Sequence, residues 1–105
     1  NHGGRQLDGS RAPFDNLAEV VDAVGDRIDV MMDSGVQRGT HILKALSLGA
    51  KAVGIGRGYL FPLAAAGQAG VDRALSLLAA EVERDMRLMG CSSVADLSRE
   101  NLRFR

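Results

Sequence analysis

The sequence is poor in cysteine, proline and aromatic residues. Its 105 residues include one cysteine, two prolines, one tyrosine and three phenylalanines, and no tryptophan. A single cysteine, Cys91, excludes an internal disulfide and fits a reducing compartment. We expect a structural role for this thiol, because no second cysteine or basic neighbour marks it as reactive.

The chain also lacks an excess of charge of either sign. It has 13 basic and 13 acidic residues, so nothing favours nucleic acid or an anionic membrane as a partner. The longest mostly apolar run, residues 59–66, is far shorter than the roughly 20 residues that span a bilayer. We therefore expect no nucleic-acid partner and no membrane span in this segment.

A helix is predicted over residues 14–24. Pro13 suits its entry and Gly25 its exit. Apolar side chains recur at the i, i+3, i+4, i+7 spacing of one helix face, which we expect to be buried: Leu17, Val20, Val21 and Val24.

Two short apolar runs, residues 28–32 and 52–55, are predicted to be buried strands. Between them lies a second predicted helix, with Thr40 as its N-cap and Gly49 at its end. Strand, helix and strand at this spacing are typical of a βαβ unit, in which the strands run parallel.

Helices dominate the remainder of the chain. We predict a short helix over residues 59–66 and a long one over residues 71–89, which Gly90 ends. Ser93 and Asp96 resemble a capping box that opens a short terminal helix. Charged side chains on the long helix are interpreted as a solvated face: Glu81, Glu83, Arg84, Asp85 and Arg87.

Other residues with chemical potential are interpreted as structural. His41 follows a glycine turn on a helix and has no partner at metal-ligand spacing, so we predict no metal site there. The four methionines are expected to fill the core: Met31, Met32, Met86 and Met89.

Two parallel strands cannot form a sheet that is covered on both faces. The element order predicts an α/β fold of the (β/α) barrel or doubly wound type, and both need more strands than this chain contains. We therefore expect it to be the C-terminal part of a larger α/β domain.

Two glycine-bearing turns, residues 33–38 and 56–58, follow the two predicted strands. Glycine lets backbone N–H groups approach an anion, the following helix directs its positive end there, and arginine adds a charged fork. In (β/α)8 barrels a phosphate often lies between the loops after strands 7 and 8 and a short extra helix. Residues 59–66 have the position of that helix, which favours a phosphate site over two ordinary turns.

His2 and Arg5 stand three residues apart in a glycine-rich stretch. Histidine moves a proton near neutral pH, and arginine holds a carboxylate through two hydrogen bonds. Together they suit one small anionic substrate, although the stretch taken alone also fits an expression remnant or a solvated loop.

These blocks resemble the C-terminal part of the FMN-dependent α-hydroxy-acid oxidase and dehydrogenase family, which includes glycolate oxidase, lactate oxidase and flavocytochrome b2. The most specific match is NHGGRQLD, residues 1–8. Further matches are DSGV at residues 33–36, GT at 39–40, KALSLGA at 44–50 and GIGR at 54–57.

The resemblance implies a TIM barrel whose last two strands, with their helices and the extra phosphate-site helix, are present here. Residues 1–105 would be the C-terminal segment of one FMN-dependent barrel domain, inactive without the upstream part. The implied reaction is oxidation of a small L-2-hydroxy acid, such as lactate or glycolate, to the 2-oxo acid. A homotetramer is also implied. The compartment is not identified by the sequence beyond the reducing intracellular setting that the single cysteine fits: cytoplasm, peroxisome or mitochondrion.

The resemblance also assigns roles to individual residues. His2 would take a proton from the substrate, Arg5 would bind its carboxylate, and Gly56 with Arg57 would hold the FMN phosphate. The flavin site would be lined by Asp33, Ser34, Gly35, Val36 and Gln37. Arginine is usual at position 37, so one phosphate contact is expected to be lost or taken over by Arg38. Gly58 stands where proline is common, which affects the turn.

The residues of this chain are also compatible with two other functions. One is a phosphate-binding TIM-barrel enzyme of another class, an isomerase or a nucleotide dehydrogenase, although neither chemistry calls for the pair of His2 and Arg5. The other is a non-catalytic half-barrel that binds a phosphorylated ligand or associates through its strand edges.

Overall fold

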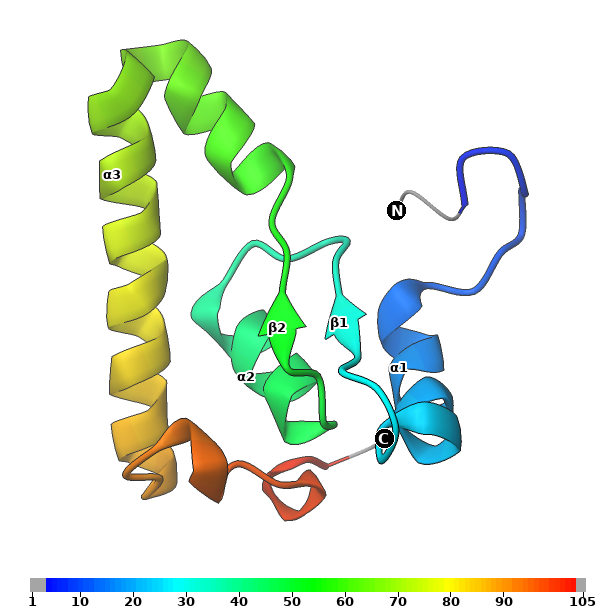
Figure 1. Ribbon diagram of the computed structural model, residues 1–105. Helices are drawn as coiled ribbons and strands as arrows, with labels where there is room; N and C mark the ends of the chain where they lie inside the picture. Colours follow the sequence, from blue (N-terminus) through cyan, green and yellow to red (C-terminus); the bar gives the residue numbers. More distant parts are fainter. Residues whose placement is uncertain (1–3, 104–105) are drawn as a thin grey trace.

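The computed structural model describes residues 4–103, which form three helices, two short strands and two 3-10 turns (Figure 1). In chain order these are α1 (Pro13–Val24), β1 (Met31–Met32), α2 (Gly39–Ser47), β2 (Ala52–Val53), α3 (Arg57–Met89), η1 (Val94–Asp96) and η2 (Arg99–Asn101).

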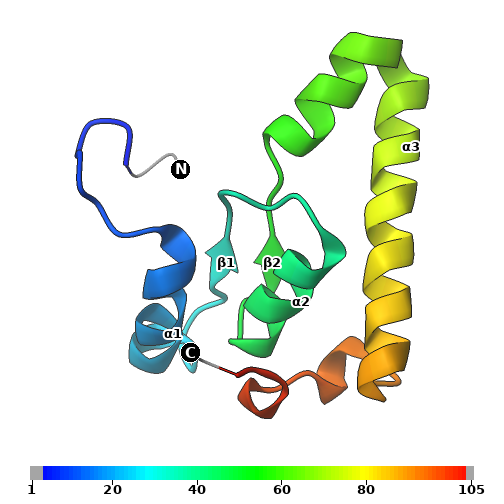
Figure 2. The ribbon, with the colours of Figure 1, turned by 180° about the vertical axis from the view of Figure 1, so that it is seen from behind.

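The two strands pair in parallel, as the βαβ spacing predicts. Met31 lies opposite Ala52 and Met32 opposite Val53. The ladder continues on both sides, because Lys51 N donates to Val30 O and Gly54 N donates to Met32 O, each at 2.8 Å. In both views α2 covers one face of the pair, α1 lies beside β1, and the long part of α3 runs alongside α2 (Figures 1 and 2).

The core lies between α1, the strand pair and α2. Its centre is Leu48, with Ala45 wholly buried beside it. The other buried members are Leu17, Val30, Met32, Val36 and Ala50. Because Met32 and Val36 flank the turn that follows β1, this core fixes where that turn begins.

The strands are shorter than predicted, and their predicted burial is only partly correct: one residue of β1 is buried, whereas in β2 Ala52 is exposed and Val53 is half-buried. Pairing covers two residues of each predicted run. Ile28 is exposed, and Met31 is 73% exposed, so their predicted burial is wrong. Successive side chains of a strand point to opposite faces. Met32 faces the core, whereas Met31 faces the side of the pair that the described residues leave open.

The first two helices follow the prediction with local differences. Pro13 begins α1 as expected, but Val20 is exposed and does not belong to the buried face. The N-cap of α2 is Arg38, in an extended conformation, and not Thr40. The predicted Thr40 cap is therefore wrong, since Thr40 already lies within the first turn of the helix.

The helix α3 contains both predicted C-terminal helices. It begins at Arg57, two residues before the predicted start, and non-helical backbone at Ala66 and Gly67 separates a short first part from a long second part. The first part leads away from β2 and the second runs back beside α2 (Figure 1). The long part ends before Gly90, as predicted.

Two capping boxes order the end of the chain. The predicted box is confirmed: Asp96 Oδ2 accepts the N–H groups of Ser92 and Ser93, each at 2.8 Å. A second box, formed by Ser98 and Asn101, opens η2 and was not predicted.

The sulfur residues are divided between the core and the surface. Cys91 is buried, and Met32 belongs to the core. Met31 and Met89 are exposed, so the prediction that all four methionines fill the core is wrong for these two. No helix within residues 4–103 combines the length and the apolar character needed to cross a membrane.

Candidate functional site

The two glycine turns meet in one hollow at the carboxyl ends of β1 and β2. Residues 33–37 line one side, and residues 54–58 with Leu60 line the other. The hollow has a volume of about 250 Å³. It therefore brings together all the residues predicted to bind the cofactor: Asp33, Ser34, Gly35, Val36, Gln37, Gly56 and Arg57.

The turn after β1 reverses direction through two consecutive left-handed residues. Ser34 has φ +89° and Gly35 has φ +72°. The Ser34 hydroxyl donates to Asp33 Oδ1 at 3.3 Å, a contact that supports the turn. A Cβ placed on Gly35 would meet no atom within 4 Å, so a ligand can reach the backbone at this point.

The opposite side of the hollow is the start of α3. The first N–H groups of a helix have no partner within it, and they carry the positive end of the helix dipole. Gly56 precedes the helix, and a Cβ there would also meet nothing within 4 Å. The exposed Arg57 adds a guanidinium at the first helical position. Open backbone, helix start and guanidinium together suit an anion such as a phosphate.

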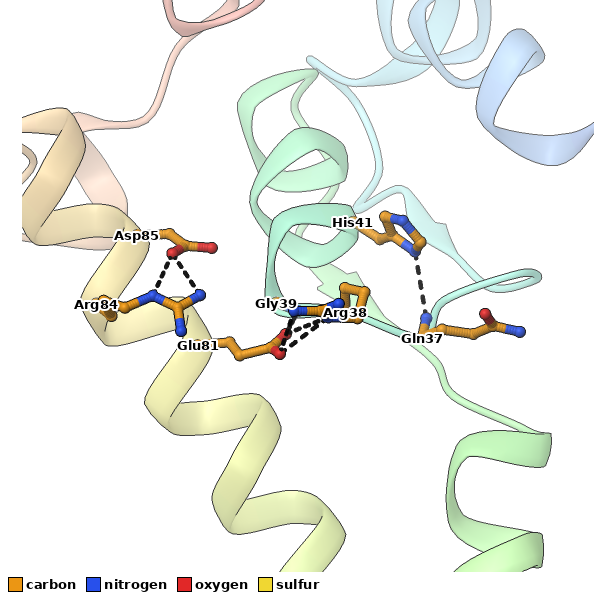
Figure 3. Close-up of polar contacts among 7 residues, drawn as sticks. All are labelled: Gln37, Arg38, Gly39, His41, Glu81, Arg84 and Asp85. Atoms are coloured by element: carbon orange, nitrogen blue, oxygen red, sulfur yellow. Dashed lines mark hydrogen bonds and ion pairs between the residues drawn. The ribbon is translucent and has the colours of Figure 1, made fainter.

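Arg38, the residue after Gln37, forms an ion pair with a carboxylate of another helix. Its guanidinium pairs with Glu81 on α3, with Nε 2.9 Å and Nη2 2.8 Å from Oε1 (Figure 3). Glu81, on the long part of α3, thus engages Nε and Nη2 of Arg38. That the phosphate contact of position 37 is lost or taken over by Arg38 stays a prediction. The hydrogen bond with Glu81 raises the pKa of Arg38 above its ordinary value.

Glu81 also caps the helix α2. Its Oε2 accepts the N–H of Gly39, the first residue of α2, at 2.7 Å. The hydrogen bond from Arg38, followed by that from the Gly39 N–H, lowers the pKa of the Glu81 carboxyl. The carboxylate therefore supplies the cap that the sequence suggested for Thr40.

At Gly39 the helices α2 and α3 approach each other backbone to backbone. A Cβ on Gly39 would lie 2.6 Å from Glu81 Cβ and 2.7 Å from Val82 N. Such distances are not tolerated between real atoms, so the contact requires glycine at this position.

The interpretation of the charges on α3 as one solvated face is wrong for two of them. The Glu81 side chain is 21% exposed and that of Asp85 is mostly buried, whereas Glu83 is 67% exposed. The role of Glu81 was missed. A signal was present, because Glu81 and Asp85 lie one helical turn apart and adjoin the apolar positions Val82 and Met86 on the same side of the helix.

His41 supports the turn after β1 from within α2. Its Nδ1 accepts the N–H of Gln37 at 3.3 Å (Figure 3). This packing role agrees with the predicted structural role of His41. Among the described residues, no group of three or more His, Cys, Asp or Glu side chains could hold a metal ion.

The predicted catalytic histidine, His2, lies outside the described residues. Arg5 belongs to an exposed turn and does not line the hollow. The segment that carries Arg5 lies on the side of the molecule to which the carboxyl ends of both strands point (Figures 1 and 2).

Comparison with known proteins gives consistent results. A family model described as FMN-dependent dehydrogenase matches residues 1–104. The chain is 48% identical over 110 residues to an L-lactate dehydrogenase (cytochrome) of Wickerhamomyces anomalus, and 53% identical over 97 residues to an L-lactate oxidase of Nostoc sp.. These matches cover 100% and 92% of the chain.

A solved structure is similar over the whole chain. It is a soluble mutant of the membrane-associated (S)-mandelate dehydrogenase from Pseudomonas putida, with a TM-score of 0.92 and 46% identity. The match covers 100% of the present chain and 30% of the mandelate dehydrogenase chain. The present chain likewise spans only 19% and 27% of the two curated relatives.

Proposed function

This chain belongs to the FMN-dependent dehydrogenase family, and we propose that it supplies the phosphate site and part of the active site of an enzyme that oxidises small L-2-hydroxy acids to 2-oxo acids. The observation that carries the proposal is the hollow in which residues 33–37 meet Gly56 and Arg57. L-Lactate and glycolate are the substrates we infer first.

The residues of the hollow fit the phosphate of FMN. Gly35 and Gly56 leave room for a phosphate oxygen to approach the backbone, and the start of α3 offers N–H groups. Arg57 would hold the phosphate through charge-assisted hydrogen bonds. Gln37 would contribute a neutral amide where the family usually has arginine. When bound, FMN accepts the two electrons that the hydroxy acid loses.

His2 and Arg5 would act on the substrate. We infer that neutral His2 takes the proton of the 2-hydroxy acid, and that Arg5 fixes the substrate carboxylate through two hydrogen bonds. The position of the Arg5 segment, on the side of the strands' carboxyl ends, supports this role. In barrel enzymes the active site lies on that side.

We further propose that residues 1–105 form the C-terminal segment of a (β/α)8 barrel domain, with β1 and β2 as its last two strands. The open face of the strand pair supports this placement, since Met31 is exposed there. An open apolar groove between β2 and α3, of about 500 Å³ and lined by Val53, Ile55 and Leu75 among others, is also left uncovered by residues 4–103. Upstream strands and helices would cover both surfaces, and the complete enzyme would be a homotetramer.

The test uses the full-length protein that contains this chain. We expect it to be yellow as purified and to lose its flavin absorbance when L-lactate or glycolate is added without oxygen. His2→Gln should retain the flavin and slow this bleaching by at least about 100-fold, the usual range for loss of a general base. Arg5→Gln should mainly raise KM, and Arg73→Gln on the exposed side of α3 should match the wild type.

Two outcomes would count against the proposal. A colourless protein that binds phosphate esters but no flavin would favour a barrel enzyme of another class. Unchanged bleaching in His2→Gln would remove the assigned role of His2 while leaving FMN binding in place.

A further inference from the structure

We propose that Glu81, which does not line the hollow, is a positioning residue for the FMN phosphate, and that it acts by holding Arg38 and Gly39 at the end of the phosphate-binding turn. This inference rests on the proposed function, because it concerns the same hollow. It assigns a role to two charged residues that do not themselves line that hollow.

Arg38, Gly39 and Glu81 form what we call the clasp (Figure 3). One carboxylate receives Nε and Nη2 of Arg38, at 2.9 and 2.8 Å from Oε1, and the backbone N–H of Gly39, at 2.7 Å from Oε2. Its partners lie 42 and 43 residues away in sequence. The clasp therefore joins two elements that only the fold brings together.

The clasp can hold the turn because its first residue, Arg38, directly follows the turn in sequence. Residues 33–37 line the hollow, and Arg38 is the next residue. Gly35 can adopt many backbone conformations, and Ser34 has φ +89°, which residues with a side chain rarely adopt, so the surrounding contacts must hold this turn in place. Core packing of Met32 and Val36 and the hydrogen bond from Gln37 to His41 hold the turn up to residue 37, and Glu81 holds the two residues that follow, Arg38 and Gly39.

A carboxylate suits this position better than a neutral group. The amino end of α2 favours negative charge, and a hydrogen bond to an ionised acceptor is about twice as strong as a neutral one. Glu81 also occupies the Arg38 guanidinium, which would otherwise lie free beside a phosphate site. If the turn is already ordered before FMN binds, the loss of conformational entropy on binding is smaller, which favours binding.

The competing explanation is that Arg38 leaves Glu81 and binds the phosphate directly. The two explanations predict opposite results for removal of the Glu81 charge. If the clasp positions the turn, its loss weakens FMN binding. If Glu81 merely holds Arg38 away from the phosphate, its loss leaves FMN binding unchanged or strengthens it.

The experiment measures the dissociation constants of FMN and riboflavin with the full-length apoprotein. Riboflavin lacks the phosphate, so it reports on the remainder of the flavin site. We expect Glu81→Gln to weaken FMN binding about tenfold, from the lost charge assistance, and to change riboflavin binding less than about twofold. The matched control is Glu83→Gln, which removes the same charge from an exposed ion pair with Arg87 on the same helix.

A second variant keeps the test decisive. Arg38→Met changes a side chain that is 62% exposed, so the protein should fold even if Glu81→Gln does not. We expect Arg38→Met to weaken FMN binding by a similar factor to Glu81→Gln, and the double variant to weaken it little further, because both substitutions open the same clasp. Faster amide hydrogen exchange over residues 33–39 should accompany each variant.

The outcomes separate the inference from the proposed function. If the wild-type protein binds no flavin, the proposed function fails and the positioning role falls with it. If the wild type binds FMN but Glu81→Gln behaves as Glu83→Gln does, only the positioning role fails. Equal weakening of FMN and riboflavin would also overturn it, since that would indicate a general loss of structure.

Discussion

The guanidinium of Arg99 and the carboxylate of Asp22 form two parallel hydrogen bonds that hold the C-terminal turns against the first helix. Nη2 lies 2.6 Å from Oδ1 and Nη1 lies 3.2 Å from Oδ2, across 77 residues of sequence. The contact lowers the pKa of Asp22 and raises that of Arg99. The contact therefore links η2, the last element of the described chain, to α1, the first.

Stability should therefore fall in acid partly through Asp22. Since its folded pKa lies below the unfolded value of about 3.9, its contribution is present above that value and is lost as the pH falls through the folded pKa. Asp22→Asn should lower Tm at pH 7 and make the fall in Tm below about pH 4 shallower. Thermal unfolding at a series of pH values checks this, with the exposed Asp26→Asn as control. An unchanged acid slope in Asp22→Asn would contradict it.

The close contact between α2 and α3 predicts that adding a side chain at Gly39 destabilises the protein. Because a Cβ there would lie 2.6 Å from Glu81 Cβ, Gly39→Ala should force the helices apart and lower the free energy of unfolding by about 1–3 kcal/mol. Gly58→Ala is the matched control, since its Cβ would meet its nearest neighbour at 3.7 Å, an ordinary contact. Denaturant titration of both variants gives the comparison, and equal stabilities would contradict the close approach.

The position of Leu48 in the core predicts a large loss of stability when its side chain is shortened. This side chain is 2% exposed, so Leu48→Ala should cost about 2–5 kcal/mol of unfolding free energy. Leu88 is 80% exposed, and Leu88→Ala should change the free energy by no more than about 0.5 kcal/mol. Denaturant midpoints of the two variants measure the difference. A small loss at Leu48 would place the core elsewhere.

The neutral residue at position 37 predicts a gain of function. Because Arg38 is bound to Glu81, Gln37→Arg should add a charged contact to the phosphate and tighten FMN binding about threefold to tenfold. Riboflavin binding should not change. The control Gln68→Arg adds the same charge at an exposed position of α3 and should leave both constants as in the wild type. Fluorescence titration of the apoprotein measures them, and equal effects of the two variants would indicate general electrostatic attraction.

Most of the element order was predictable because local rules govern it. The proline at the start of α1, the glycine after α3 and the capping box at Ser93 each act within a few residues, and all three predictions are confirmed. The parallel pairing of the strands also followed from spacing, since a helix between two strands returns the chain to the same edge.

The limits of the strands were not predictable from their apolar runs. Whether Ile28 and Met31 are buried depends on what covers the second face of the strand pair, and β-propensity does not contain that information. For the same reason the exposure of Val20 could not be read from the spacing of apolar residues in α1.

The candidate site, too, was predictable from the sequence only in part. The sequence was enough to identify the two glycine turns, since glycine, arginine and a following helix start lie within six residues of each other and carry their chemistry locally. The partner of Arg38 was set by the fold, because Glu81 lies 43 residues away and meets it only where Gly39 lets α2 and α3 touch. Local backbone preferences act over a few residues, whereas the pairing of two distant charges depends on how the helices pack.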